Sequence, residues 1–302
     1  MSEHAAHRAG IAYAVSAFLM WGMFPLYWKA LAAVPALEVV AHRTGWGFVA
    51  MAVWVTLRRR WPEVRTVAAR PRTLLLLAGS AVLIASNWLL YIWAVINGHV
   101  VESSLGYFIN PLVSVVLGVV VLRERLSPLQ KVAVALAVAG VAVMALGHGG
   151  LPLIALGLAL TFAFYGLARK LVAADAVIGL LVETAMLAPL AAGYLALLAA
   201  RGAGALGHAG PRIETLLIFG GVVTAVPLVM FALGARRLPL STVGIIQYLS
   251  PSCQFLLAVL LYREPFTATH AVTFACIWTA LGLLTWDLQA RLRSVEPAVP
   301  GS

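Results

Sequence analysis

Apolar runs long enough to cross a bilayer follow one another along nearly the whole chain, and they restrict its fold more than any other feature. A transmembrane helix needs about 20 predominantly apolar residues. Of the 302 residues, 62% are hydrophobic and only 11% are charged, which is too little charge to cover the surface of a soluble protein of this length. The sequence therefore predicts an all-α integral membrane protein without a soluble domain.

We expect about ten transmembrane helices in two halves of five. The expected spans are 11–31, 36–57, 73–96, 102–122, 127–146, 151–168, 176–199, 214–235, 242–262 and 267–286. A break at His148-Gly149-Gly150 separates the halves, so residues 1–149 form the first predicted unit and residues 150–290 the second. The segment 291–302 contains Pro297 and Pro300 and is predicted to be a disordered cytoplasmic tail.

The second half repeats a pattern of the first half at an offset of 140 positions. In each half, polar residues share one helical face beside a proline, and the span ends in an Arg-Glu pair. The matching positions are Tyr107 and Gln247, Asn110 and Ser250, Ser114 and Gln254, Pro111 and Pro251, and Arg123-Glu124 and Arg263-Glu264. We interpret this match as an internal duplication. Matched interruptions in two halves are the best sequence pointer to the binding site of a transporter.

An odd number of spans in each half makes the second half enter the membrane the other way up. The prediction is two inverted five-helix repeats, with a site between them near the bilayer midplane. The net charge of +10 comes from Arg and Lys scattered through short loops, mostly on one side of the predicted topology. The positive-inside rule then places both termini in the cytoplasm. This scatter argues against nucleic-acid binding.

Polar and aromatic side chains inside the spans are the candidates for substrate binding, because aromatic walls with a few polar groups suit an amphiphilic organic solute. These candidates are Asn87, Trp88, Tyr91, Tyr107, Asn110, Gln247 and Tyr248. Helix packing and interfacial anchoring are the alternatives for each of them. Asn110 and Gln247 are expected to face one midplane cavity.

Two titratable residues are candidates for coupling transport to protons. Glu183 lies about 10 Å inside the seventh span at 1.5 Å per residue, and His42 occupies the matching place in the second span. An ionisable group in a span is a functional hypothesis by default. For Glu183 the alternative is a packing hydrogen bond to a neighbouring helix. For His42 it is a mutual network with Glu38 and Arg43 near the outer surface.

Charged residues at the span ends have simpler interpretations. Glu102 favours a helix N-terminus, with Lys29 and Arg263 as expected partners, and the two Arg-Glu pairs are expected to tie the bundle together. The sequence contains no P-loop, HExxH or GxSxG motif and no His/Cys cluster with metal-ligand spacing. We therefore expect no cofactor, no metal and no enzymatic activity. Cys253 and Cys276 lie in apolar runs and are interpreted as small packing residues.

Several segments resemble motifs of the RarD family, in the EamA group of the drug/metabolite transporter superfamily. They are WGMFPLYWK at 21–29, Glu38 with His42-Arg43, SNWLLYIWAV at 86–95, SLGYFINPL at 104–112, TAVPL at 224–228 and QYLSP at 247–251. The resemblance extends from about Gly10 to Trp286. It implies ten helices in two EamA-type repeats and a permease of the bacterial inner membrane. The family's chloramphenicol label is weakly tied to mechanism, and the family assigns no catalytic residue to carry over.

The resulting prediction is a secondary transporter or exporter of small organic solutes such as amino acids, metabolites or drugs. It would work by alternating access at a midplane site, and proton coupling is left open. The alternatives are a flippase for lipids or lipid-linked substrates and a membrane-embedded enzyme that modifies lipids. The expected partners are a small-molecule solute, protons and membrane lipids. A homodimer is compatible with the sequence.

Overall fold

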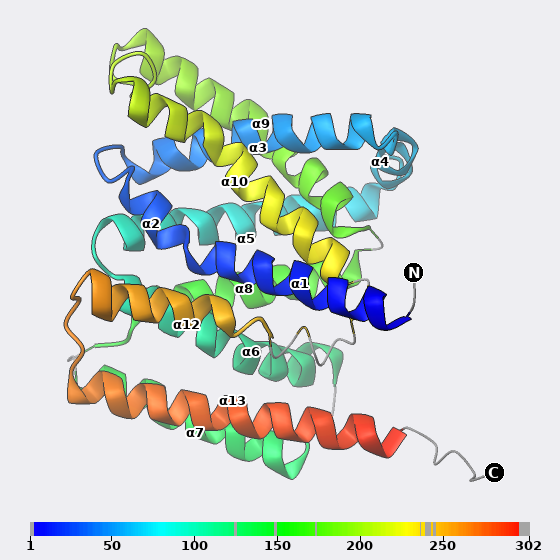
Figure 1. Ribbon diagram of the computed structural model, residues 1–302, viewed down its shortest axis with the longest axis vertical. Helices are drawn as coiled ribbons and strands as arrows, with labels where there is room; N and C mark the ends of the chain where they lie inside the picture. Colours follow the sequence, from blue (N-terminus) through cyan, green and yellow to red (C-terminus); the bar gives the residue numbers. More distant parts are fainter. Residues whose placement is uncertain are drawn as a thin grey trace.

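The structure is a computed structural model, and it describes residues 3–123, 126–147, 150–172, 174–235, 237–238, 243 and 246–295. The described residues form a bundle of long helices joined by short connections (Figure 1). The first-half helices are α1 (Glu3–Gly22), α2 (Phe24–Lys29), α3 (Ala36–Leu57), α4 (Trp61–Ala68), α5 (Pro71–Ile96), α6 (Val100–Leu122) and α7 (Pro128–Gly147). The later ones are α8 (Leu153–Leu171), α9 (Ala176–Ala200), α10 (Pro211–Ala235), α12 (Leu249–Leu256), the π-helical turn η1 (Leu257–Leu261) and α13 (Ala268–Val295).

Eight helical segments in the described part of the chain are long and apolar enough to cross a membrane. They are His7–Lys29, Pro71–Ile96, Val100–Val121, Pro128–Gly147, Leu153–Leu171, Ala176–Ala200, Pro211–Gly234 and Ala268–Asp287. Helix α3 is equally long, but Glu38, His42 and Arg43 lower its hydropathy. A shorter apolar helix covers Leu249–Leu261. The multi-pass helical fold is thus confirmed, whereas the number of ten spans stays a prediction.

Four details differ from the predicted spans. The first span is broken at Met23, because Pro25 has no backbone donor and its ring crowds the preceding turn. The arginine-rich loop after α3 contains the unpredicted helix α4. Helix α13 continues to Val295, so the start of the predicted disordered tail is helical. The described part of the ninth span is short and ends in η1. Glu124 and residues 239–242, 244–245 and 296–302 lie outside the described residues.

Except for the short helix α4, each helix of the first half has a counterpart in the second half. When every such helix is exchanged for its counterpart, the most extensive of the packed helix pairs again become packed pairs. The exchange relates α1 and α2 to α8, α3 to α9, α5 to α10, α6 to α12, and α7 to α13. Helix α6 packs on α8 as α12 packs on α1, and α5 packs on α8 as α10 packs on α1. The pairs α3–α9, α6–α12 and α7–α13 map onto themselves. This pattern relates the two halves as repeats of one another, whereas their inverted orientation in the membrane stays a prediction.

Two glycines permit matching close approaches in this pattern. A Cβ atom at Gly106 of α6 would lie 2.7 Å from the carbonyl oxygen of Ala155 on α8. A Cβ at Gly22 of α1 would lie 2.6 Å from the Cβ of Cys253 on α12. Small residues let membrane helices approach to backbone contact, which replaces the hydrophobic driving force that is missing in lipid. The interpretation of Cys253 as a small packing residue agrees with this contact.

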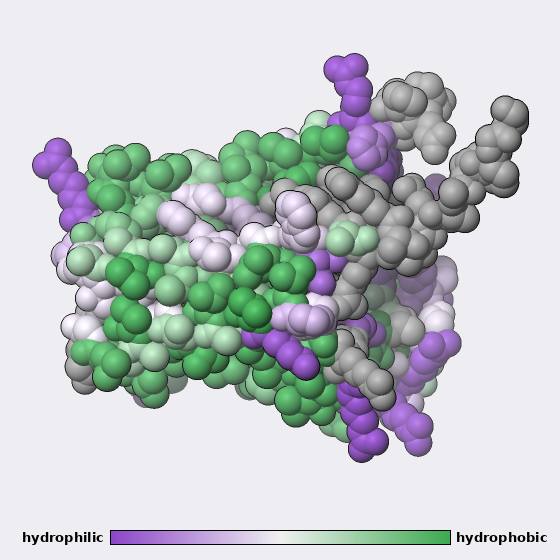
Figure 2. Space-filling model, turned by 90° about the horizontal axis from the view of Figure 1, so that it is seen from below, coloured by the Kyte–Doolittle hydropathy of each residue, from purple (hydrophilic) through white to green (hydrophobic). Residues whose placement is uncertain are grey.

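The surface of the bundle is divided as a membrane protein requires. Apolar side chains cover its middle, and hydrophilic ones gather toward the two ends (Figure 2). The start of α1, the helix α4 and the end of α13 all lie at the same end (Figure 1). This arrangement agrees with the prediction that the N-terminus, the arginine-rich loop and the C-terminal helix share one side of the membrane.

Candidate functional site

Asn87 is the centre of a buried polar cluster that joins α5, α6 and α8. Its side chain is 0% exposed. The Nδ2 atom donates to the carbonyl oxygen of Leu158 at 3.1 Å and to Oγ1 of Thr161 at 2.9 Å. The hydroxyl of Tyr107 donates to Oδ1 of Asn87 at 3.2 Å. The amide is thereby held by two neighbouring helices, as a buried polar group requires.

Aromatic rings form the walls of this cluster. The ring centroids of Tyr91 and Tyr107 lie 5.5 Å apart, and those of Tyr107 and Phe162 lie 5.9 Å apart, both in edge-to-face geometry that aromatic pairs prefer. The hydroxyl of Tyr91 is buried and has no hydrogen-bond partner among the described residues. The structure therefore brings together Asn87, Tyr91 and Tyr107.

Trp88 belongs to the same region through Arg43, which the sequence analysis did not select as a candidate for substrate binding. The Cζ atom of Arg43 lies 4.1 Å from the ring centroid of Trp88, 5.1 Å from that of Trp28 and 5.8 Å from that of Phe24. These distances are typical of cation–π contacts. The side chain extends from α3 toward rings of α2 and α5, so it adjoins the cluster around Asn87. The aromatic run in 21–29 together with Arg43 was the available signal for this cage.

Of the alternative network of Glu38, His42 and Arg43, the structure keeps only the Glu38–His42 pair at ion-pair distance and does not include Arg43. Oε1 of Glu38 accepts a hydrogen bond from the backbone N–H of Ala205 at 2.6 Å. Nε2 of His42 lies 3.9 Å from the same oxygen, too far for a hydrogen bond. Arg43, the next residue along α3, points to the aromatic cage instead, because successive residues of a helix face different directions.

Glu183 is 0% exposed and is held by groups from α5 and α8. Oγ of Ser80 donates to Oε1 at 2.5 Å, and the hydroxyl of Tyr165 donates to Oε2 at 3.4 Å. Nη1 of Arg169 lies 3.7 Å from Oε1. A Cβ at Gly179 would overlap the guanidinium of Arg169, so the absence of a side chain at Gly179 makes room for this cation. The predicted packing hydrogen bond is present, and the coupling role stays a prediction.

No hydrogen bond or ring contact among the described residues joins Asn110, Gln247 or Tyr248 to Asn87. Asn110 keeps its Oδ1 atom buried without a partner. Tyr248 stacks with Phe108 at 6.5 Å between ring centroids. Gln247 takes part in backbone hydrogen bonds at the start of α12. The shared cavity of Asn110 and Gln247 therefore stays a prediction.

Two members of the repeated polar stripe do not point into a common site. Ser114 is exposed, and its hydroxyl donates back to the carbonyl of Asn110 at 3.0 Å. Nε2 of Gln254 contacts the carbonyl of Trp21 on α1 at 3.4 Å. Although α6 and α12 pack against equivalent helices, the side chains at these equivalent positions have different surroundings.

Glu264 ties the two halves together at one end of the bundle, as expected for an end pair. Its carboxylate accepts from the backbone N–H groups of Val100 and Val101 at 2.9 and 2.8 Å, which satisfies donors that the start of α6 leaves open. Burial raises the pKa of Glu264 above its usual value, although these N–H groups oppose the shift. The prediction of Lys29 and Arg263 as partners of Glu102 was wrong. Nδ1 of His99 lies 3.4 Å from Oε1 of Glu102, and Nζ of Lys29 donates to the carbonyl oxygen of Val95.

Asp175 ties the halves together at the opposite end. It caps α9 by accepting from the N–H groups of Val177 and Ile178, and its Oδ2 accepts from Arg60 at 3.1 Å. Burial opposes ionisation of this carboxyl, but the hydrogen bonds from Arg60 and from the backbone hold the pKa of Asp175 below its usual value. Arg60 also donates hydrogen bonds to the carboxylate of Glu63. Its bonds to Glu63 and, to a smaller extent, to Asp175 raise the pKa of Arg60.

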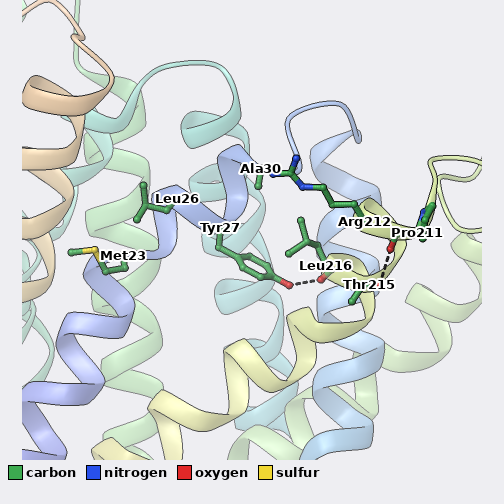
Figure 3. A pocket seen from close by; sticks show the side chains of 8 residues that line it. All are labelled: Met23, Leu26, Tyr27, Ala30, Pro211, Arg212, Thr215 and Leu216. Atoms are coloured by element: carbon green, nitrogen blue, oxygen red, sulfur yellow. Dashed lines mark hydrogen bonds between the residues drawn. The ribbon is translucent and has the colours of Figure 1, made fainter.

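Two grooves open on the surface of the bundle. One lies between α2 and α10, where the hydroxyl of Tyr27 bonds to the carbonyl of Leu216 (Figure 3). Its lining is Met23, Leu26, Tyr27, Ala30, Pro211, Arg212, Thr215 and Leu216. The other is lined by Phe108, Tyr248, Ser252, Trp278, Leu281, Gly282, Thr285 and Trp286. In the part of the chain that the structure covers, no three His, Cys, Asp or Glu residues gather as metal ligands would.

Comparison with known proteins assigns this architecture to a class. The model of the EamA-like transporter family matches residues 8–146, close to the first predicted repeat. A solved crystal structure has a TM-score of 0.59 at 19% identity, covering 94% of this chain and 98% of that chain; this likeness shows the fold alone. The helical bundle and the family match thus define an EamA-type, multi-pass membrane protein.

Curated relatives narrow the assignment. Protein RarD of Escherichia coli (strain K12) is 48% identical over 280 residues, covering 93% of this chain and 95% of the relative. The uncharacterized transporter YojE of Bacillus subtilis (strain 168) is 45% identical, covering 94% and 96%. The chloramphenicol-sensitive protein RarD of Pseudomonas aeruginosa is 33% identical, covering 94% and 96%. The chain belongs to the RarD family, and its apolar helices and bacterial relatives identify a multi-pass protein of the inner membrane.

Proposed function

We propose that the chain is a secondary transporter that carries small organic solutes, such as amino acids, metabolites or drugs, by alternating access near the bilayer midplane. The cluster of Asn87, Tyr91 and Tyr107 supports this proposal. Asn87 lies about 24 Å from the start of α5 and about 14 Å from its end at 1.5 Å per residue, so the cluster is deep in the membrane. Polar groups at that depth are rare and mark solute or ion pathways.

The aromatic surroundings of the cluster favour an amphiphilic organic solute over a bare ion. Binding sites for such solutes combine apolar and aromatic walls with a few convergent polar groups, and Trp88, Tyr91, Tyr107 and Phe162 supply both here. The site is closed in this conformation, since Asn87 is fully buried. Opening toward one side and then the other would expose it in turn, which the exchange pattern of the two halves makes possible.

We further propose that Glu183 couples transport to protons. Its neighbours Ser80, Tyr165 and Arg169 all present donors to the carboxylate, so the ionised form binds them together. Protonation would remove the charge that attracts Arg169 and would loosen α9 from α8. His42, with a buried Nε2 that makes no hydrogen bond among the described residues, is the second candidate for carrying a proton.

Uptake into proteoliposomes tests the proposal. The purified full chain would be supplied with a panel of amino acids, small metabolites and chloramphenicol, with and without a pH gradient. Saturable uptake supports a transporter, and uptake that rises with the gradient supports coupling. Asn110→Ala and Gln247→Ala should each weaken solute affinity if both face the midplane site. Unchanged affinity in both variants would assign these residues to packing.

The groove between α2 and α10 favours a second candidate, a lipid flippase. Met23 and Leu26 in this groove are 40% and 42% exposed, so an acyl chain could lie against them from the side (Figure 3). A fluorescent phospholipid whose outer-leaflet label is quenched by dithionite measures this activity. Protein-dependent loss of the protected inner-leaflet signal, without solute uptake, would favour the flippase over the solute transporter.

A further inference from the structure

We propose that Arg43 binds the carboxylate of an amphiphilic monocarboxylate, which would be the substrate class of the site. This inference rests on the proposed transport function and goes beyond it. It starts from the burial of Arg43, whose side chain is only 5% exposed. A buried guanidinium needs a counter-charge or a full set of hydrogen bonds, because removing a charge from water is unfavourable unless the charge is paired.

No protein group supplies that counter-charge among the described residues. Arg43 makes no salt bridge there, and its Nε atom is buried without a hydrogen-bond partner. The acidic residue on the same helix, Glu38, is bonded to the backbone of Ala205 instead. The ionisable groups that interact electrostatically with Arg43 are the tyrosines Tyr27, Tyr91 and Tyr107. Cation–π contacts with Trp28, Trp88 and Phe24 offset part of the desolvation, but they supply neither a counter-charge nor a hydrogen-bond acceptor.

The unsatisfied groups around Arg43 select for an acceptor. Among the residues that the structure describes, Nε1 of Trp28, which can only donate, is buried without a partner, and so is the hydroxyl of Tyr91. The ring centroid of Trp28 lies 5.1 Å from Cζ of Arg43. Tyr91 is one turn along α5 from Trp88, whose ring centroid lies 4.1 Å from the same atom. A carboxylate accepts several hydrogen bonds at once and pairs with a guanidinium in two parallel bonds. One carboxylate would therefore provide acceptors for the buried donors of Arg43, Trp28 and Tyr91.

The aromatic rings around Arg43 indicate the chemical character of the part of the solute that is attached to the carboxylate. The rings of Phe24, Trp28 and Trp88 enclose the guanidinium, so the body attached to the carboxylate would be apolar or aromatic. A second charge on the solute would have no partner in this cage. The rings hold Arg43 in place in the closed conformation, and the carboxylate reaches it when the surrounding helices open.

Paired probes test the inference in proteoliposomes that contain the full chain. The probes are phenylacetate and hexanoate with their neutral amides, phenylacetamide and hexanamide, each competing for uptake of a solute identified in the panel above. We expect each carboxylate to compete at least tenfold better than its amide. In Arg43→Met this preference should disappear, and in Arg43→Lys, which keeps the charge but loses the paired geometry, it should be reduced.

Arg58→Met is the matched control. Arg58 follows α3 directly and also lies over a tryptophan, Trp54, at 5.9 Å, yet it is exposed. Its replacement should leave the preference unchanged. A purely structural role of Arg43 would weaken acid and amide equally.

The possible failures can be told apart. If the natural chain takes up solutes but does not prefer carboxylates, or if Arg43→Met keeps the preference, the inference is overturned and transport stands. If no solute is taken up and carboxylate probes do not alter the tryptophan fluorescence of the purified protein, both proposals fail. Quenching by phenylacetate that Arg43→Met abolishes supports the anion site independently of transport.

Discussion

Glu183 and Arg43 are both charged residues buried inside the helical bundle, but their surroundings differ. The Glu183 carboxylate accepts two hydrogen bonds, from α5 and α8, and lies within ion-pair distance of the Arg169 guanidinium on α8. Arg43 has aromatic rings around its guanidinium and no carboxylate within ion-pair distance among the described residues. Both lie about two turns inside a helix of the α3–α9 pair, which the exchange of halves maps onto itself.

The difference separates a charge that the protein satisfies itself from one that it leaves to a ligand. A buried ion with protein partners stabilises the packing of the helices that supply them, and removing it exposes those partners. A buried ion without such partners destabilises the closed state, but it can bind a solute that supplies the missing counter-charge. Stability and transport measurements on the two residues should therefore give opposite patterns.

The largest expected effect is on stability, in Glu183→Ala. The change leaves Tyr165 without its hydrogen-bond acceptor and Arg169 without its counter-charge, and breaking a buried pair costs about 3 kcal/mol or more. Thermal unfolding in detergent micelles should show a clearly lower midpoint. Arg43→Met is the counterpart and should leave the midpoint unchanged or raise it, because it removes an uncompensated buried charge. If both variants lowered the unfolding midpoint equally, Arg43 would have a structural role and the contrast with Glu183 would be wrong.

The next effect concerns coupling, in Glu183→Gln. The amide still accepts a hydrogen bond from Ser80, so the fold should be retained, but it cannot exchange a proton. We expect the part of uptake that depends on a pH gradient to fall at least tenfold, while solute affinity changes little. Gradient-driven uptake equal to that of the natural chain would exclude Glu183 from coupling.

Gly179→Ala sharpens the same test without touching the carboxylate. The added methyl would displace the guanidinium of Arg169 from its place beside Glu183. Because the end of a flexible side chain can move, the loss of stability should be small, about 1 kcal/mol. A large loss of gradient-driven uptake in this variant would show that the ion pair itself matters.

A smaller effect distinguishes the two tyrosines of the cluster. Tyr107→Phe removes the donor to Oδ1 of Asn87 and should lower the free energy of unfolding by about 1 kcal/mol. Tyr91→Phe removes a buried hydroxyl without a partner, so stability should be unchanged while solute affinity falls. The two variants can be compared by thermal unfolding and by competition for uptake. The reverse order of stability would contradict the hydrogen bonds described here.

The smallest expected effect is the pH dependence of the partly exposed pair of Arg60 and Asp175. The pKa of Asp175 is lower in the folded than in the unfolded chain, so near this pKa the folded state binds fewer protons. The pair therefore stabilises the folded chain fully at pH values above the usual aspartate pKa of about 3.9. This contribution is lost as pH falls through the lower, folded-state pKa. At most about 1 kcal/mol is expected for such a partly exposed pair. The difference in unfolding midpoint between the natural chain and Asp175→Asn should vanish in acid.

The sequence by itself determined the membrane class, most helix bounds and the depth of Glu183, because these depend on local apolar length and on charge within a span. It also determined that Asn87 and Tyr91 share a helix face, since i, i+4 spacing does so in any helix. Only the tertiary structure decided which helix each face meets. It separated Arg43 from Glu38 and His42, placed Arg169 against Gly179, and left Ser114 on the surface. Those outcomes depend on packing between segments far apart in the chain, and no spacing along one helix can determine its neighbour.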